Sequence, residues 1–192
     1  MVAAARTISA LGFDVVTFNF LYTEARRRLP DKNPVLEACY RAVILAVADA
    51  IDSARRGLFI GGKSMGGRIA TQVAAADRDM KLAGLVLLGY PLHPPGRPEQ
   101  RRDAHLPLVQ RPMLFVQGSR DAFGTPAELS PILARLGPTA VLHVIDGGDH
   151  SFKVSKTSAT PQTAVDDDVL RTVAAWMATI TGRSAPGPHR SA

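Results

Sequence analysis

Short apolar runs alternate along this chain with longer segments whose apolar residues recur at helical spacing. The runs are rich in Val, Ile, Leu and Phe, and this alternation is typical of a mostly parallel sheet covered by helices. We therefore expect an α/β protein. The predicted strands are residues 13–20, 58–60, 82–88, 113–117 and 141–145.

Helix start and stop signals lie between these runs. Asn33 followed by Pro34 predicts a helix start with Asn33 as the N-cap, and apolar spacing continues over residues 35–54 until Gly57. Aspartates at 166–168 predict the opening of the last helix, because acidic groups suit a helix N-terminus. The other helices are expected at residues 2–11, 66–76, 126–136 and 165–181.

Length and composition favour one packed domain. The chain has 192 residues, of which 46% are hydrophobic and 21% charged. We expect residues 1–181 to form this domain and residues 182–192 to be a flexible tail. Residues 90–112 contain several prolines and no clear periodicity, so they predict a long ordered loop rather than a linker between domains.

Charge and cysteine content restrict the partners and the compartment. The net charge is +6, but the basic residues form short clusters without interleaved aromatics, so we expect a solvated surface and no nucleic acid partner. Cys39 is the only cysteine, which excludes an intrachain disulfide and favours a reducing compartment. We find neither a signal peptide pattern nor an apolar run of about 20 residues, and therefore expect a cytoplasmic protein without membrane association.

Residues 58–68 carry the most informative motif. The pattern Gly62-x-Ser64-x-Gly66 follows a short apolar run and precedes a helical segment. In this arrangement a strand turns abruptly into a helix and exposes a serine hydroxyl above the sheet edge. We expect glycine to be required on both sides of Ser64, because a side chain there would collide with the tight turn.

The same serine also ends the pattern Gly57-x-x-x-x-Gly62-Lys63-Ser64, which matches the phosphate-binding loop of nucleotide hydrolases. In that loop the strand ends before the first glycine, whereas here three large apolar residues, 58–60, fall inside it. The run at 82–88 also does not end in an aspartate that could serve magnesium. We therefore prefer the serine nucleophile to a nucleotide site.

A nucleophilic serine needs a base, and the base needs an acid that orients it. Asp121 lies just beyond the predicted strand 113–117, and His150 lies just beyond the predicted strand 141–145. Both follow the serine in the chain order known for such sites, and the carboxyl ends of parallel strands are where open sheets place ligands. Ser64, Asp121 and His150 are therefore the candidate catalytic residues.

Other candidates for these roles remain open. Asp146 and Asp149 precede His150 on the same loop, and either could orient it in place of Asp121, although the chain order favours Asp121. The other histidines are less suitably placed: in a predicted strand, in the long loop or in the tail. They are His143, His93, His105 and His189.

Four segments together resemble a known group: residues 62–68, 88–96, 117–121 and 147–152. They are similar to the dienelactone-hydrolase-like branch of the α/β-hydrolases, and in particular to bacterial relatives of the hydrolase-like domain of testis-expressed proteins and of a non-specific-lethal complex subunit. The resemblance implies Ser64 as nucleophile, Asp121 as acid and His150 as base, with the Met65 N–H as one oxyanion donor. Because the eukaryotic members act partly as interaction modules, it also implies a second role as a binding scaffold.

The chain departs from this group at its N-terminus. In the α/β-hydrolase fold a strand ending in a His-Gly type loop precedes the first helix and supplies the second oxyanion N–H. Here the chain begins on that helix. We expect an N-terminally truncated hydrolase fold whose missing strand would lie between the predicted strands 13–20 and 58–60.

The expected activity is hydrolysis of a small ester or related acyl substrate through an acyl-enzyme, without a metal or an organic cofactor. The alternative is a catalytically weak interaction module. Several arginines follow predicted strand ends near the expected site mouth, which leaves an anionic substrate open, although solvated loops are the favoured explanation because exposed arginines need no ligand. These are Arg26, Arg27, Arg28, Arg97, Arg101, Arg102 and Arg120.

Overall fold

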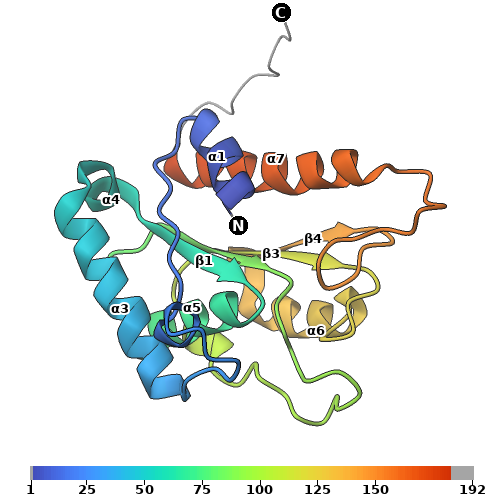
Figure 1. Ribbon diagram of the computed structural model, residues 1–192, viewed down its shortest axis with the longest axis horizontal. Helices are drawn as coiled ribbons and strands as arrows, with labels where there is room; N and C mark the ends of the chain where they lie inside the picture. The colour runs from blue at the N-terminus through green and yellow to red at the C-terminus, as the bar shows by residue number, and fades with distance from the viewer. Residues whose placement is uncertain (1, 183–192) are drawn as a thin grey trace, which may run out of the picture.

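The computed structural model describes residues 2–182, and its centre is a four-stranded parallel sheet (Figure 1). The strands are paired in chain order, so each one lies beside the strand that precedes it. They are β1 (Phe59–Lys63), β2 (Gly84–Leu88), β3 (Met113–Gly118) and β4 (Ala140–Ile145). The fold class predicted from the alternating pattern is confirmed. Except for Gly182, the predicted tail 182–192 lies outside the described residues.

Helices cover the two faces of the sheet, as Figure 1 shows, with α3, α5 and α6 on one face and α1 and α7 on the other. None of the helices within residues 2–182 is long and apolar enough to cross a membrane. The helices are α1 (Val2–Ala10), α2 (Leu21–Glu24), α3 (Asn33–Ala50), α4 (Asp52–Gly57), α5 (Met65–Ala76), α6 (Pro126–Leu136) and α7 (Gln162–Thr181), with short 3-10 turns at Leu106–Leu108 and Gly137–Thr139.

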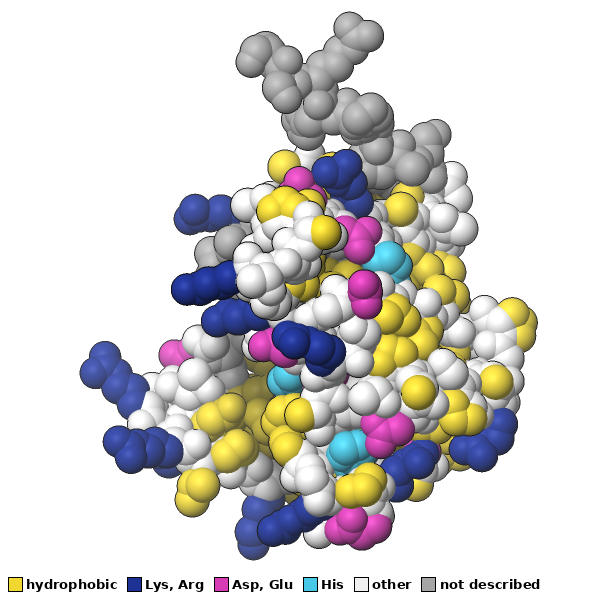
Figure 2. Space-filling model, turned by 90° about the vertical axis from the view of Figure 1, so that its right-hand side faces the viewer, with side chains coloured by type: hydrophobic (Ala, Val, Ile, Leu, Met, Phe, Trp, Pro, Cys, Tyr) yellow, Lys and Arg dark blue, Asp and Glu magenta, His cyan; other side chains and the backbone are white. Residues whose placement is uncertain are grey.

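The surface carries both signs of charge. Figure 2 shows Lys and Arg side chains spread over one face, with Asp, Glu and hydrophobic side chains between them.

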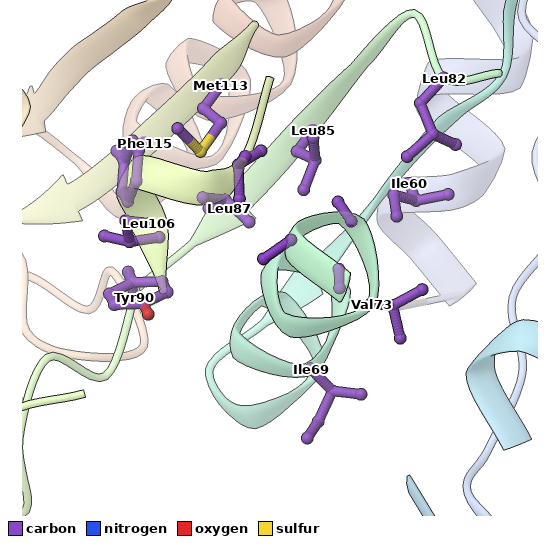
Figure 3. Close-up of a cluster of buried hydrophobic side chains, with 14 of the residues drawn as sticks. Ile60, Ile69, Val73, Leu82, Leu85, Leu87, Tyr90, Leu106, Met113 and Phe115 are labelled. Atoms are coloured by element: carbon purple, nitrogen blue, oxygen red, sulfur yellow. The ribbon is translucent and has the colours of Figure 1, made fainter. Parts of the chain in front are cut away.

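The core is divided by the sheet, because successive strand residues point to opposite faces. Every residue of β3 is buried, and Met113 and Phe115 pack with α5 in one cluster, part of which is shown in Figure 3. Leu114 and Val116 pack on the opposite face against α7. Burying a side chain such as Phe115 contributes about 1.5–3 kcal/mol. β3 is therefore the strand around which both layers assemble.

The strand expected at residues 13–20 is wrong, because the structure has no strand there. The segment is extended, but its aromatic residues pack on a helix rather than pairing with β1. The Phe18 and Phe20 rings lie 5.1 and 6.3 Å from the Tyr40 ring of α3. Apolar alternation indicates a half-buried extended segment, and this one buries its apolar side without joining the sheet.

Two helix starts also differ from expectation. Lys32, not Asn33, is the N-cap of α3, and the Asn33 side chain instead contacts α5 through Gln72 and Arg68. α7 begins at Gln162, so the aspartates at 166–168 lie beyond its first turn, where the helix dipole no longer favours them. The prediction of one long helix over 35–54 is also wrong, because Ile51 interrupts it and separates α3 from α4.

The turn from β1 into α5 depends on close backbone contacts. A Cβ at Gly61 would overlap the Val86 carbonyl, and one at Gly67 would lie 2.8 Å from the Gly62 oxygen. Gly62 has a φ of +156°, and its Cβ would approach α5 at 3.1 Å. The prediction that a side chain at Gly66 would collide with the turn is wrong, because nothing lies within 4 Å of a Cβ placed there. Packing between strand and helix, not the turn alone, therefore requires glycine.

This contrast gives a test on adjacent residues. Gly67→Ala should lower the free energy of unfolding by about 1–3 kcal/mol, because its methyl group meets backbone that cannot move freely. Gly66→Ala should leave it unchanged or raise it by up to about 1 kcal/mol, since alanine favours helix. Urea unfolding of both variants measures the difference, and equal stabilities would contradict the packing argument.

Candidate active site

Three side chains form a continuous line of hydrogen bonds at the carboxyl edge of the sheet. His150 Nε2 lies 2.8 Å from Ser64 Oγ, and His150 Nδ1 lies 2.8 and 3.0 Å from the two carboxylate oxygens of Asp121. Ser64 lies between β1 and α5, Asp121 follows β3 and His150 follows β4. The structure thus brings together the three residues that the sequence singled out.

Ser64 has an unusual backbone conformation. Its φ of 52° and ψ of −120° are sparsely populated for a residue with a side chain, and such strain is frequent at functional sites. The Ser64 N–H donates to the Leu88 carbonyl at 2.8 Å, which ties the turn to the end of β2. Its hydroxyl makes no capping bond to α5. The side chain is therefore directed to His150 instead of completing the helix.

Asp121 is an almost fully buried carboxylate, with 1% of its surface exposed. Besides His150, it accepts hydrogen bonds from the Gln117 amide and from the Phe123 N–H, both at 2.8 Å. These donors complement the carboxylate charge that water would otherwise solvate. Asp121 is thus held in one orientation, facing the imidazole.

The two competing aspartates contact other groups. Asp149 accepts hydrogen bonds from the Ser151 and Lys153 N–H groups; burial opposes their effect, but these bonds hold the pKa of its carboxyl below the usual value. Asp146 accepts a hydrogen bond from Ser119 Oγ at 3.4 Å. Neither is bonded to His150, so the geometry favours Asp121 among the three alternatives.

The imidazole of His150 is held from two sides. The Phe123 ring lies 4.2 Å from it, centroid to centroid, at an angle of 31°. Gly89 has a φ of +61° and packs so closely that a Cβ would lie 3.0 Å from the His150 carbonyl and 3.4 Å from Nδ1. With Nδ1 donating to Asp121, Nε2 is left to accept from the Ser64 hydroxyl.

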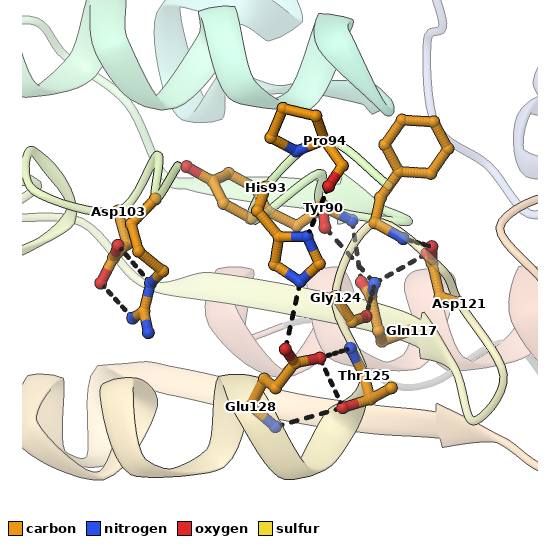
Figure 4. A network of polar contacts seen from close by, with 11 residues as sticks. Tyr90, His93, Pro94, Asp103, Gln117, Asp121, Gly124, Thr125 and Glu128 are labelled. Carbon is orange, nitrogen blue, oxygen red and sulfur yellow. Dashed lines mark hydrogen bonds and ion pairs between the residues drawn. The ribbon is translucent and has the colours of Figure 1, made fainter. Parts of the chain in front are cut away.

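Gln117 organises the acid and was missed in the sequence. Its side-chain oxygen accepts from the Tyr90 N–H, and its amide group donates to Asp121 and to the carbonyls of Tyr90 and Gly124, as Figure 4 shows. Gln117 is fully buried at the end of β3. The sequence signal that could have indicated this role is a single polar residue near the end of an otherwise apolar strand.

A second polar contact braces the neighbouring loops. The His93 N–H donates to the Phe123 carbonyl at 3.0 Å, and His93 Nε2 lies 3.1 Å from Glu128 (Figure 4). Glu128 also closes a capping box with Thr125 at the start of α6. The loop after β2 and the loop after β3 are therefore joined next to the Phe123 ring.

The other histidines lie away from Ser64 in separate contacts. His143 pairs with Asp168 at 2.8 Å, on the outer part of β4 and α7. His105 Nε2 lies 2.8 Å from the Thr71 hydroxyl, and burial lowers the pKa of His105 to about 4. His189 lies outside the described residues. None of the described ones replaces His150.

A cavity of about 300 Å³ opens beside Ser64. Ser64, Met65 and Arg68 line it from the turn and α5, while Phe123 and Arg102 line it from two loops. Met65 is the first residue of α5, and the first N–H groups of a helix have no partner within the helix. The residues that line the cavity thus include Ser64, the first residue of α5 and two arginines.

The nucleotide-loop pattern has no corresponding structure. Residues 59–63 form β1 and pair with β2, so the backbone that would have to surround a phosphate is part of the sheet. Within residues 2–182 there is also no group of three His, Cys, Asp or Glu side chains that could hold a metal ion.

The comparisons with known proteins agree with this fold. A family described as alpha/beta hydrolase domain matches residues 1–178. Among solved structures, an α/β serine hydrolase homologue from Coxiella burnetii is 21% identical, with a TM-score of 0.67 over 90% of this chain and 76% of that one. An α/β serine hydrolase without a lid from Xanthomonas campestris is 23% identical, with a TM-score of 0.67 over 91% and 72%.

A protein of unknown function from Agrobacterium tumefaciens is similar in fold, with 15% identity and a TM-score of 0.68 over 96% of this chain and 78% of that one. The match to the family covers nearly the whole chain, and the strand, turn and helix around Ser64 are arranged as that fold requires. The chain belongs to the α/β-hydrolase family.

Proposed function

We propose that the protein is a serine hydrolase that cleaves a small ester or related acyl substrate. The observation that carries this proposal is the continuous hydrogen-bonded line from Ser64 Oγ through His150 to Asp121. A serine hydroxyl is a weak nucleophile unless an adjacent base removes its proton, and His150 Nε2 is within reach to do so. The cavity of about 300 Å³ beside Ser64 suits a small acyl group.

The proposed reaction proceeds in two halves. Ser64 Oγ attacks the ester carbonyl while its proton passes to His150, and Asp121 stabilises the resulting imidazolium. The carbonyl oxygen becomes an oxyanion, to which the Met65 N–H donates. His150 then gives the proton to the leaving alcohol, and the acyl group remains on Ser64. In the second half, water replaces the alcohol and releases the acid.

Finer assignments belong to the same proposal. We assign the chain to the dienelactone-hydrolase-like branch on the motif resemblance, and to the cytoplasm because its single cysteine leaves no intrachain disulfide. The proposed reaction uses only protein groups and water. We propose a small molecule as its substrate, and no nucleic acid partner, because the basic residues form short clusters without interleaved aromatics.

The nucleophile can be tested by covalent labelling. A fluorophosphonate probe should label the wild-type protein, because its phosphorus atom reacts with an activated serine, and Ser64→Ala should abolish the labelling. Ser151→Ala is the matched control, since it removes an exposed serine beside His150. Gel fluorescence or intact mass spectrometry gives the readout. Absence of labelling would favour the weak interaction module instead, whereas labelling that is unchanged in Ser64→Ala would overturn the assignment of Ser64 as the nucleophile.

The orienting acid can be tested by comparing two isosteric variants. Asp121→Asn should reduce kcat/KM for a reactive aryl ester by roughly 10³- to 10⁴-fold, because an amide at this position no longer favours the imidazole tautomer with a proton on Nδ1. Asp149→Asn should change kcat/KM by less than about threefold, since Asp149 serves only the loop backbone. Circular dichroism of the two variants should show that both remain folded. The reverse order of effects would assign the role to Asp149.

A further inference from the structure

Two guanidinium groups line the cavity together with the proposed nucleophile. Arg68 lies in the first turn of α5, four residues after Ser64, and lines the same cavity as Ser64. Arg102 comes from the long loop after β2 and lines the same cavity. Two arginines from different elements therefore line the cavity beside the proposed nucleophile.

The charge of Arg68 is poorly compensated by the protein. Its guanidinium contacts only amide oxygens, of Asn33 at 3.4 Å and of Gln72 at 3.5 Å, and its Nε is buried without a partner. Within residues 2–182 it forms no ion pair with a carboxylate. A partly buried cation in this state is stabilised when an anion enters its surroundings.

The electrostatics agree with this geometry. Burial lowers the pKa of the Arg68 guanidinium, and the nearby charge of Arg102 lowers it further, while Tyr90 and Glu37 act in the opposite direction. The two cations are thus close enough to repel each other. An anion between them would remove that repulsion.

Arg102 is fixed by its backbone instead of by an acidic partner. Its N–H donates to the Leu92 carbonyl at 2.9 Å, and its carbonyl accepts from the hydroxyl of the buried Tyr90 at 2.7 Å. No ion pair to Arg102 is found in the described part of the chain. Its neighbour Arg101, by contrast, is exposed and makes two hydrogen bonds to Asp103.

The acidic residue at the cavity already has a partner. Asp31 lines the cavity, but its two carboxylate oxygens lie 2.6 and 3.0 Å from the Arg27 guanidinium. Asp31 is therefore already paired with Arg27, which is not among the residues that line the cavity, and neither Arg68 nor Arg102 forms an ion pair with it.

We propose that Arg68 and Arg102 bind a carboxylate of the substrate, so that the protein prefers small esters whose acyl chain carries a free carboxylate. Guanidinium groups suit this role because their N–H donors match the two oxygens of a carboxylate. The inference rests on the proposed hydrolase function and names its substrate class. Binding the remote carboxylate would hold the ester carbonyl near Ser64 Oγ.

A matched pair of esters tests the preference. Monoethyl glutarate and ethyl valerate have acyl chains of equal length and differ in the terminal carboxylate. We expect a kcat/KM at least about tenfold higher for monoethyl glutarate, as expected for a charge-assisted hydrogen bond. Arg102→Gln should lower that value by roughly 10- to 100-fold and should lower the value for ethyl valerate by a much smaller factor, so that the ratio of the two values falls. Arg101→Gln is the control, because Arg101 is already paired with Asp103. Rates are followed by pH-stat titration.

Arg68 needs a second variant, because its partly buried side chain also contributes packing. Arg68→Lys keeps the charge but loses the two-pronged donor, so it should lose less of the preference than Arg68→Gln. Fluorophosphonate labelling of each variant reports whether Ser64 and His150 remain in place. Loss of labelling together with loss of the preference would assign Arg68 to folding and overturn its binding role.

A binding measurement separates this inference from the proposed function. Glutarate should bind to the Ser64→Ala protein in isothermal titration calorimetry, and Arg102→Gln in that background should weaken binding at least about tenfold. Equal hydrolysis of the two esters in every variant would overturn the carboxylate site but leave the hydrolase intact. Absence of hydrolysis and labelling with glutarate binding retained would overturn the hydrolase and support the anion site.

Discussion

The shared direction of the four strands is the constraint on which the rest of the molecule depends. Because each strand pairs in parallel with the one before it, every strand ends at the same edge of the sheet. The loops that carry Ser64, Asp121 and His150 therefore converge, although the residues are far apart in sequence. The burial of β3 on both faces keeps this edge in register.

Buried polar contacts connect the candidate nucleophile site to the proposed carboxylate site. Gln117 bonds Asp121 on one side and the Tyr90 backbone on the other, and the Tyr90 hydroxyl bonds the Arg102 carbonyl. A polar group buried without its partner costs about 1–3 kcal/mol. Each residue of this hydrogen-bond network therefore holds the next one in position. The same network orients the acid and holds the loop that carries Arg102.

Sequence reasoning found the residues whose position follows from topology. Ser64, Asp121 and His150 each stand just past a strand, and strand ends are predictable from apolar runs and glycine. The strand at 13–20 was predicted wrongly, because extended conformation is local whereas pairing needs a second backbone. Arg68 and Gln117 were missed for a related reason: a polar residue in a mostly apolar segment reveals its role only when its tertiary neighbours are known.

The contacts among His93, Phe123 and Glu128 restrain one wall of the cavity beside Ser64. Pro91 and Phe123 line the cavity from two loops, and these contacts couple the loops to each other and to the first turn of α6. Moving the Phe123 wall outward would break the His93 contacts and fray the helix start together. A cavity wall held in this way favours ligands that fit its present shape. Larger molecules would bind less well, because binding them would require both loops to move.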